Sequence, residues 1–221
     1  MTVSWIVGEI ESVLAPRLGA RAMACVRSDT WQQASSDIES RLRALGMIPR
    51  GYPDLTPPWK EGTNVISVSS EVLTRAWRHR STGYVFAPLQ SWLAQWSEPA
   101  RAYLASEFDD HGLLAIDVVA ANLTRMIEAG PRAILINMFR AVFEPRPVRH
   151  AGTGETVRER IRKANIMIAQ VSRVTGARVV DVDSILGDVG AVSLDADYRL
   201  ASERARGLVA EAIARAIEVT A

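Results

Sequence analysis

The chain has 221 residues, of which 48% are hydrophobic and 23% charged, and its 26 basic residues almost balance 25 acidic ones. This length suits one domain with a substantial core, and the composition is that of an ordinary globular protein. A near-neutral charge argues against a nucleic-acid or anionic-membrane partner, and the arginines are mixed with carboxylates along the predicted helices, as on solvated faces.

The single cysteine, Cys25, excludes an internal disulfide, and no Cys/His cluster has the spacing of zinc ligands. No GxGxxG or Walker A motif is present, so the sequence predicts neither a metal nor a cofactor. The amino-terminal residues lack the features of a secretory signal, and no apolar run is long enough to span a bilayer. We therefore expect a cytoplasmic protein, with a homodimer as the common form of soluble assembly.

Five short apolar runs predict strands. Each is nearly continuous, which is typical of strands buried on both faces of a parallel sheet. In chain order they cover residues 3–7, 21–26, 64–68, 133–138 and 177–182.

Amphipathic helices are predicted between and after these runs. Ser36 with Glu39, and Thr156 with Glu159, have the spacing of capping boxes. Apolar residues at helical spacing continue from Ile116 towards residue 130, and from Val157 to a stop at Gly176. A last helix is expected to open near residue 202.

The alternation of strands and helices predicts βαβ units in a single domain over residues 1–221. We expect a three-layer α/β/α sandwich with a five-stranded parallel sheet, flavodoxin-like in its winding. Residues 83–110 are rich in aromatic side chains and are interpreted as an insertion of short helices over one end of the sheet. Within it, Trp92 and Trp96 are four residues apart and are predicted to share one helix face, either as packing or as the cover of a ligand cleft.

Segments near three predicted strands, and at the carboxyl end of the chain, resemble the SGNH/GDSL hydrolase superfamily in order and spacing. Gly8 to Ser12 follow the first strand where that family has its Gly-Asp-Ser block, and Cys25 to Thr30 lie where it has its second block. Residues 165–182 and 193–213 are similar to its penultimate helix, last strand and closing helix. The resemblance implies the strand order 2-1-3-4-5.

The family's catalytic residues are not matched. Ile10 stands at the position of the nucleophilic serine, Glu9 at the preceding aspartate, and Leu200 at the histidine that follows Asp197 in the family's final block. Acyl transfer by serine requires a base within hydrogen-bond reach and oxyanion donors, which isoleucine and leucine cannot supply. The ligand-contacting positions that the resemblance implies are Glu9, Ile10, Ser28, Asp29, Ser69, Ser70, Asp197 and Leu200.

Relocated catalytic residues are the alternative. Ser12 or Ser28 would be the nucleophile and His111 or His150 the base, with Asp197 a further candidate. Each also has an ordinary interpretation: Ser12 as a helix residue, Ser28 beside a common helix start, and His150 as an exposed loop side chain. His111 follows two aspartates and is predicted to open a helix, either as a metal or base cluster or as a solvated amino terminus.

Three functional hypotheses follow. The first is a degenerate SGNH-like protein without serine esterase activity, retained to bind a small ligand or a protein partner. The second is an active ester hydrolase or acyltransferase with relocated residues. The third is an unrelated flavodoxin-like enzyme or nucleotide binder with the carboxylates of Glu9, Asp29 and Asp181 at its cleft.

Overall fold

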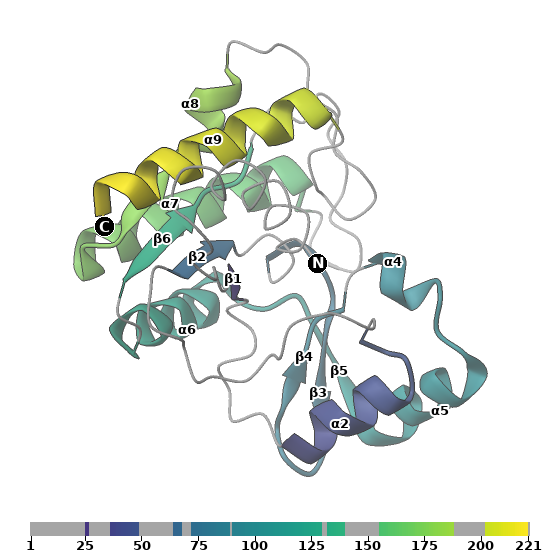
Figure 1. The fold of residues 1–221 in the computed structure, drawn as a ribbon. Coiled ribbons are helices and arrows are strands. Elements are labelled where there is room, and N and C mark those ends of the chain that lie inside the picture. Colours follow the sequence, from purple (N-terminus) through teal and green to yellow (C-terminus); the bar gives the residue numbers. More distant parts are fainter. Residues whose placement is uncertain are drawn as a thin grey trace.

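Two sheets and the helices around them make up the part of the chain described by the computed structural model. The described residues are 25–26, 36–48, 64–67, 72–88, 90–129, 132–139, 155–187 and 202–220. Figure 1 shows the parallel sheet under the long helix α9, and a second group of helices and strands at the lower right. No helix in these ranges is long and apolar enough to cross a membrane.

The central sheet has four parallel strands within the described residues. They are β1 (Cys25–Val26), β2 (Asn64–Ser67), β6 (Ala133–Ile136) and β7 (Arg178–Val180), in the order β1-β2-β6-β7. All three pairings are parallel, as the apolar runs predict. The first predicted strand, residues 3–7, lies outside the described residues, so a fifth strand stays a prediction.

The predicted strand order is wrong at one edge. In the order 2-1-3-4-5, the first strand would separate the strand at Cys25 from the strand at Asn64. Instead β1 pairs directly with β2, with Cys25 opposite Val65 and Val26 opposite Ile66. Alternating strands and helices predict parallel pairing, but they do not specify which strands become neighbours.

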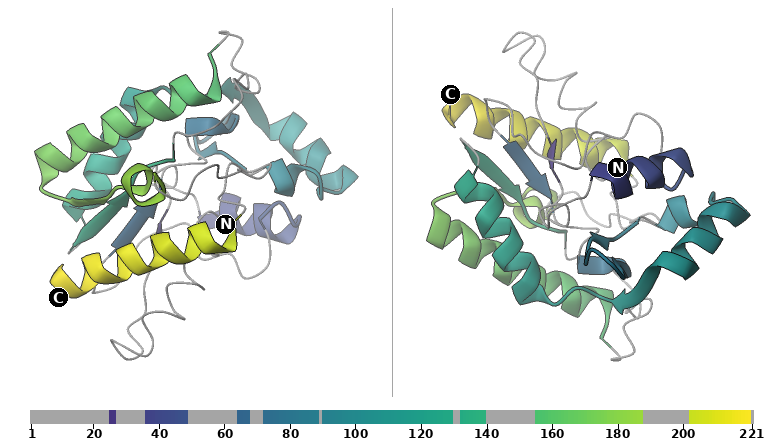
Figure 2. Two further views of the ribbon diagram at one scale, coloured as in Figure 1. Left: turned by 90° about the horizontal axis from the view of Figure 1, so that it is seen from above. Right: turned by 90° about the horizontal axis from the view of Figure 1, so that it is seen from below.

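Helices cover both faces of the central sheet, as predicted. Helices α6 (Ile116–Ala129) and α7 (Val157–Thr175) pack on one face, and α8 (Val182–Leu186) and α9 (Glu203–Thr220) pack on the other. Figure 2 shows the strands between these two helical layers.

The register of the strands explains the layers. Neighbouring strands place Val65 beside Ile134, and Ile136 beside Val180, and these side chains all join the cluster around α8 and α9. The alternate residues, Ile66, Leu135 and Val179, face the cluster around α6 and α7. Successive side chains point to opposite faces of a strand, so each run supplies both cores.

Both predicted ends of α7 are confirmed. The Thr156 hydroxyl accepts a hydrogen bond from the backbone N–H of Glu159 (3.2 Å), and the Glu159 carboxylate accepts one from the backbone N–H of Thr156 (2.8 Å). Gly176 ends the helix with φ at 75°, a left-handed conformation that glycine adopts without strain.

The second sheet, here called the accessory sheet, is antiparallel. It contains β3 (Ala76–His79), β4 (Val85–Phe86) and β5 (Phe108–Gly112) in the order β4-β3-β5. Around it lie α2 (Ser36–Ala44), α4 (Gln90–Leu93) and α5 (Glu98–Glu107). The predicted insertion therefore has its short helices, but it also has strands that the sequence did not reveal, because Phe-Asp-Asp-His-Gly lacks a strand-like apolar pattern.

The accessory sheet has two buried faces. Ala76 and Val85 join the cluster beneath α6 and α7, whereas Trp77 and Phe86 pack into a separate aromatic cluster with α2 and α5, here called the accessory core. The accessory sheet is therefore the layer shared by both groups of elements.

One buried arginine holds the two ends of the accessory sheet to α7. Arg160 Nε donates to the carbonyl of Val72, just before β3, at 2.9 Å, and its Nη2 donates to the carbonyl of Leu114, just after β5. Its Nη1 lies 3.5 Å from Glu155. Burial lowers the pKa of the Arg160 guanidinium and the Glu155 carboxylate opposes that shift, and arginine stays charged at neutral pH.

The two tryptophans of the insertion do not share a helix. Trp92 lies in α4, which ends at Leu93, and Trp96 lies beyond it, before α5, which begins at Glu98 with Pro99 in its first turn. Both are buried in the accessory core. Trp96 donates from Nε1 to the carbonyl of Met47 (3.1 Å), which favours the packing interpretation over a ligand cover.

Candidate functional site

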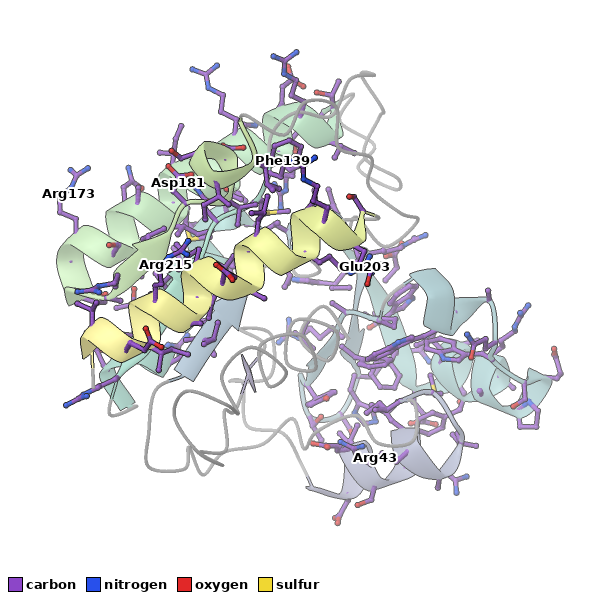
Figure 3. The ribbon with its side chains drawn as sticks, turned by 45° about the horizontal axis from the view of Figure 1, so that its top comes forward. Arg43, Phe139, Arg173, Asp181, Glu203 and Arg215 are labelled. Atoms are coloured by element: carbon purple, nitrogen blue, oxygen red, sulfur yellow. The ribbon has the colours of Figure 1, made fainter. Side chains whose placement is uncertain are left out.

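The carboxyl edge of the central sheet is the place where an open α/β sheet binds ligands. Asn137 to Phe139 follow β6 there, and Asp181 follows β7. Figure 3 labels Phe139 and Asp181 at these strand ends.

Asn137 joins the ends of the two strands. Its Nδ2 donates to Oδ1 of Asp181 at 2.8 Å, and its Oδ1 accepts from the backbone N–H of Val182 at 2.6 Å. Its backbone N–H reaches the carbonyl of Val180 at 3.3 Å, one residue beyond the strand pairing. The amide therefore fixes the path of the chain as it leaves β7 and enters α8.

Asn165, in the middle of α7, holds the residue after Asn137 in the same way. Its Oδ1 accepts from the backbone N–H of Met138 at 2.8 Å, and its Nδ2 donates to the carbonyl of Met138 at 2.6 Å. The same Nδ2 lies 3.4 Å from a carboxylate oxygen of Asp183. Two side-chain amides thus supply the bonds that sheet pairing no longer gives the backbone.

Asp181 is the exposed carboxylate of this edge. It is the N-cap of α8, where Oδ1 accepts from the backbone N–H of Ser184 at 3.2 Å as well as from Asn137. Within the described residues, no partner contacts its second oxygen, Oδ2. One oxygen is therefore fixed by the fold, and the other is an acceptor for a hydroxyl, an amine or an N–H of a ligand.

Sequence reasoning placed Asp181 at this edge but missed Asn137 and Asn165. The available signal was an asparagine directly after the run Ala-Ile-Leu-Ile, where an amide is costly in a buried strand but useful at its end. Nothing in the sequence marked Asn165, which lies within a long amphipathic helix.

Most of the predicted site residues lie outside the described residues. This holds for the nucleophile candidates Ser12 and Ser28, the base candidate His150, and the whole predicted ligand-contacting set of Glu9, Ile10, Ser28, Asp29, Ser69, Ser70, Asp197 and Leu200. Their roles stay predictions.

His111 is described, and its predicted setting is wrong. It lies exposed in β5 and opens no helix, because α6 begins only at Ile116. The two aspartates before it pair with arginines: Arg80 Nε donates to Asp109 Oδ1 at 2.9 Å, and Arg75 Nε donates to Asp110 Oδ1 at 2.5 Å. Strand pairing therefore explains the acidic residues without a metal.

The described ranges contain no group of three His, Cys, Asp or Glu side chains that could hold a metal ion. The one buried histidine among them, His79, has its Nδ1 within 3.2 Å of the hydroxyls of Ser81 and Thr82 and packs edge-on against Phe108. It is a satisfied core residue of the accessory sheet.

Comparisons with known proteins find solved structures of similar layout. Axe2, an acetylxylan esterase from Geobacillus stearothermophilus, is 15% identical over 98% of this chain and 80% of its own, with a TM-score of 0.45. LAE5, an alpha/beta hydrolase enzyme from the metagenome of Lake Arreo, Spain, is 13% identical over 96% of this chain and 81% of its own, with a TM-score of 0.47. No family model and no curated protein matches the chain. Similarity at this level assigns neither a family nor an activity.

Proposed function

We propose that this chain binds a small polar ligand at the carboxyl edge of its parallel sheet, as a degenerate SGNH/GDSL-like protein without serine esterase activity. The observation that carries the proposal is Asp181. The fold fixes one oxygen of its carboxylate through Asn137 and Ser184, and leaves the other without a partner among the described residues. A preorganised acceptor at a ligand-binding edge favours recognition.

The residues favour binding over acyl transfer. Ile10 and Leu200 stand where the resembled family has its serine and histidine, and neither side chain activates a nucleophile. The hydrogen bonds described at the carboxyl edge are made by amides, carboxylates and backbone groups, which suit the orientation of a ligand, and no histidine base is among them. Loss of triad members can cost a factor of about a million in turnover.

The chemistry of the edge indicates the class of ligand. A carboxylate oxygen accepts hydrogen bonds, so the ligand would present a hydroxyl or amino group to Asp181. Asn137 contributes indirectly, because both of its polar atoms already bind the protein. A sugar, a polyol or a small amine has these properties.

Whether the chain has an activated serine is tested with a fluorophosphonate probe and intact-mass spectrometry, alongside a heat-denatured control. We expect no adduct on the folded protein. A single adduct restricted to the folded protein would reveal an activated serine and overturn this part of the proposal, and peptide mapping would then name the nucleophile.

The ligand site is tested with a panel of monosaccharides, polyols and small amines in a thermal-shift assay. Asp181→Asn keeps an oxygen for Asn137 and Ser184 while replacing the free oxygen with an amide nitrogen. We expect any compound that stabilises the wild type to lose this effect in Asp181→Asn and to keep it in Asp117→Asn, an exposed aspartate of α6. Equal stabilisation of both variants would remove Asp181 from the site.

A further inference from the structure

The solvent-facing side of α7 carries a stripe of arginines. At 100° per residue, Arg158, Arg162, Ile166, Ala169 and Arg173 fall within a sector of about 80°. All five are exposed, whereas Ile161, Ala164 and Ile168 lie on the opposite, buried face. We call these five exposed residues the arginine stripe. Figure 3 shows Arg173 extending away from the ribbon of α7.

No acid forms an ion pair with the arginine stripe within the described residues. The two carboxylates close enough in sequence are already engaged. Glu155 pairs with Lys163 at 2.6 Å and with Arg160, and Glu159 accepts both the backbone N–H and the hydroxyl of Thr156. Arg158, Arg162 and Arg173 have no hydrogen bond or ion pair in the part of the chain that the structure describes.

Two other helices each pair one arginine with an acid of the same helix. Arg43 pairs with Glu39 at 2.6 Å in α2, and Arg215 pairs with Glu211 at 3.0 Å in α9, each four residues apart. In α7 the residue four positions from Arg158 is another arginine, an arrangement that costs a few tenths of a kcal/mol in an isolated helix. The sequence prediction that arginines are mixed with carboxylates therefore fails on this one face.

Apolar side chains lie inside the arginine stripe. Ile166 is 51% exposed, one turn beyond Arg162, and the exposed Ala169 follows it three residues later. Phosphates gain nothing from an isoleucine, whereas protein interfaces commonly combine arginine with an apolar anchor. The near-neutral net charge also gives no long-range attraction to nucleic acid. Because the apolar side of α7 is buried in the core, this helix cannot insert into a membrane surface.

We propose that the arginine stripe binds an acidic, leucine-bearing helix of a partner protein. From Arg158 to Arg173 the stripe is about 22 Å long, which matches four turns of a partner helix lying alongside. Carboxylates of the partner would pair with Arg158, Arg162 and Arg173, and its leucines would cover Ile166. This surface involves neither Asp181 nor Asn137, so it is independent of the proposed ligand site.

The test uses fluorescein-labelled helical peptides and fluorescence anisotropy. The first peptide has about five turns with glutamates and leucines on one face, and the second has the same charge with alanine in place of leucine. We expect the leucine peptide to bind the wild-type chain more tightly than the alanine peptide. Charge reversal of Arg158, Arg162 and Arg173 to glutamate should weaken the leucine peptide at least about tenfold, and Ile166→Ser should remove the advantage of leucine over alanine.

The matched control reverses three exposed arginines elsewhere, Arg78, Arg204 and Arg215, for the same change in net charge. It should retain the affinity of the wild type, and circular dichroism should show that every variant is folded. Equal weakening in both triple variants would overturn the proposal, because only net charge would then matter. Tighter binding of a DNA duplex or of phosphatidylserine vesicles through the same arginines would also overturn it.

Discussion

The two sheets use their polar residues in opposite ways. In the accessory sheet, the arginines that flank β3 neutralise aspartates of β5, in the pairs Arg75–Asp110 and Arg80–Asp109. In the central sheet, the strands themselves are apolar, and the polar residues Asn137 and Asp181 stand directly beyond their carboxyl ends. The first arrangement neutralises carboxylates with arginines, whereas the second holds the Asp181 carboxylate through a side-chain amide and a backbone N–H and leaves its charge without a basic partner among the described residues.

This contrast shows why a conspicuous sequence motif can be structural. The run Asp-Asp-His resembles a catalytic or metal-binding motif, yet its three residues are the exposed part of strand β5, which pairs with β3. A lone asparagine after an apolar run looks ordinary, yet its hydrogen bonds fix the chain at the carboxyl edge of the sheet, where we propose the ligand site. The arrangement of neighbours, more than residue type, decides which polar groups are available.

The largest effect is expected at the junction of the two sheets. Arg160→Met removes the bonds that hold Val72 and Leu114, and it takes one partner from the half-buried Glu155, which keeps Lys163. Each buried carbonyl left without its donor costs about 1–3 kcal/mol, so urea unfolding should show a loss of about 2–6 kcal/mol. Arg158→Met, exposed on the same helix, should change the unfolding free energy by less than about 0.5 kcal/mol. A similar loss of unfolding free energy in both variants would mean that the hydrogen bonds of Arg160 do not hold the accessory sheet to α7.

The next effect concerns the cores on either side of the accessory sheet. Leu123→Ala in the core under α6 and Leu42→Ala in the accessory core should each cost about 2–5 kcal/mol, because both leucines are completely buried. Because the accessory sheet is shared, both variants should unfold in one transition. Tryptophan fluorescence, to which Trp77, Trp92 and Trp96 of the accessory core contribute, should then coincide with far-ultraviolet circular dichroism. Separate transitions would show that the two regions fold independently.

A substitution at the carboxyl edge of the central sheet should lower the unfolding free energy by a smaller amount. Asn165→Ala leaves the backbone N–H and carbonyl of Met138 without their partner, at a cost of about 1–3 kcal/mol in the unfolding free energy. Gln170→Ala, on the exposed side of α7, serves as the control. If the two variants have equal stability, water replaces the amide of Asn165 without loss, and Asn165 does not hold the backbone of Met138 at the strand end.

The sequence predicts the regular parts of this fold well, for physical reasons. Strands β2, β6 and β7 supply side chains to the cores on both faces and are therefore mainly apolar, and α7 has a capping box at Thr156 and a glycine stop at Gly176. These signals are local. The order of the strands is not local, and the direct pairing of β1 with β2 could not be derived from alternation alone.

The accessory sheet and the candidate site escaped prediction for related reasons. Strands of two to five residues with exposed charges, such as β5, are stabilised by their neighbours and not by their own sequence. Likewise, the role of Asn165 depends on Met138, which is 27 residues away. Only Asp181, next to the end of a predicted strand, could be placed at the carboxyl edge from the sequence.

A pH-dependent effect is expected at the amino terminus of α7. The backbone N–H of Thr156, and then its hydroxyl, hold the pKa of the Glu159 carboxyl below its ordinary value of 4.5. A lowered pKa means that the carboxylate contributes stability above pH 4.5, and that this contribution is lost as the pH falls through the pKa of the folded state. Glu159→Gln should therefore be less stable than the wild type at pH 7, with the difference disappearing in acid. A difference that persists at low pH would assign the loss to packing, and urea unfolding across pH would distinguish the two.

The smallest effect is expected in the accessory sheet, at the surface pair of Asp109 and Arg80. Both side chains are about half exposed or more, so Asp109→Asn should cost less than about 1 kcal/mol in the unfolding free energy. Added salt should reduce the difference further, because screening weakens exposed pairs. The same variant, and His111→Gln beside it, should leave the response to every compound of the ligand panel unchanged, in contrast to Asp181→Asn. A ligand response that depends on Asp109 or His111 would place function on the accessory sheet and reverse the comparison between the two sheets.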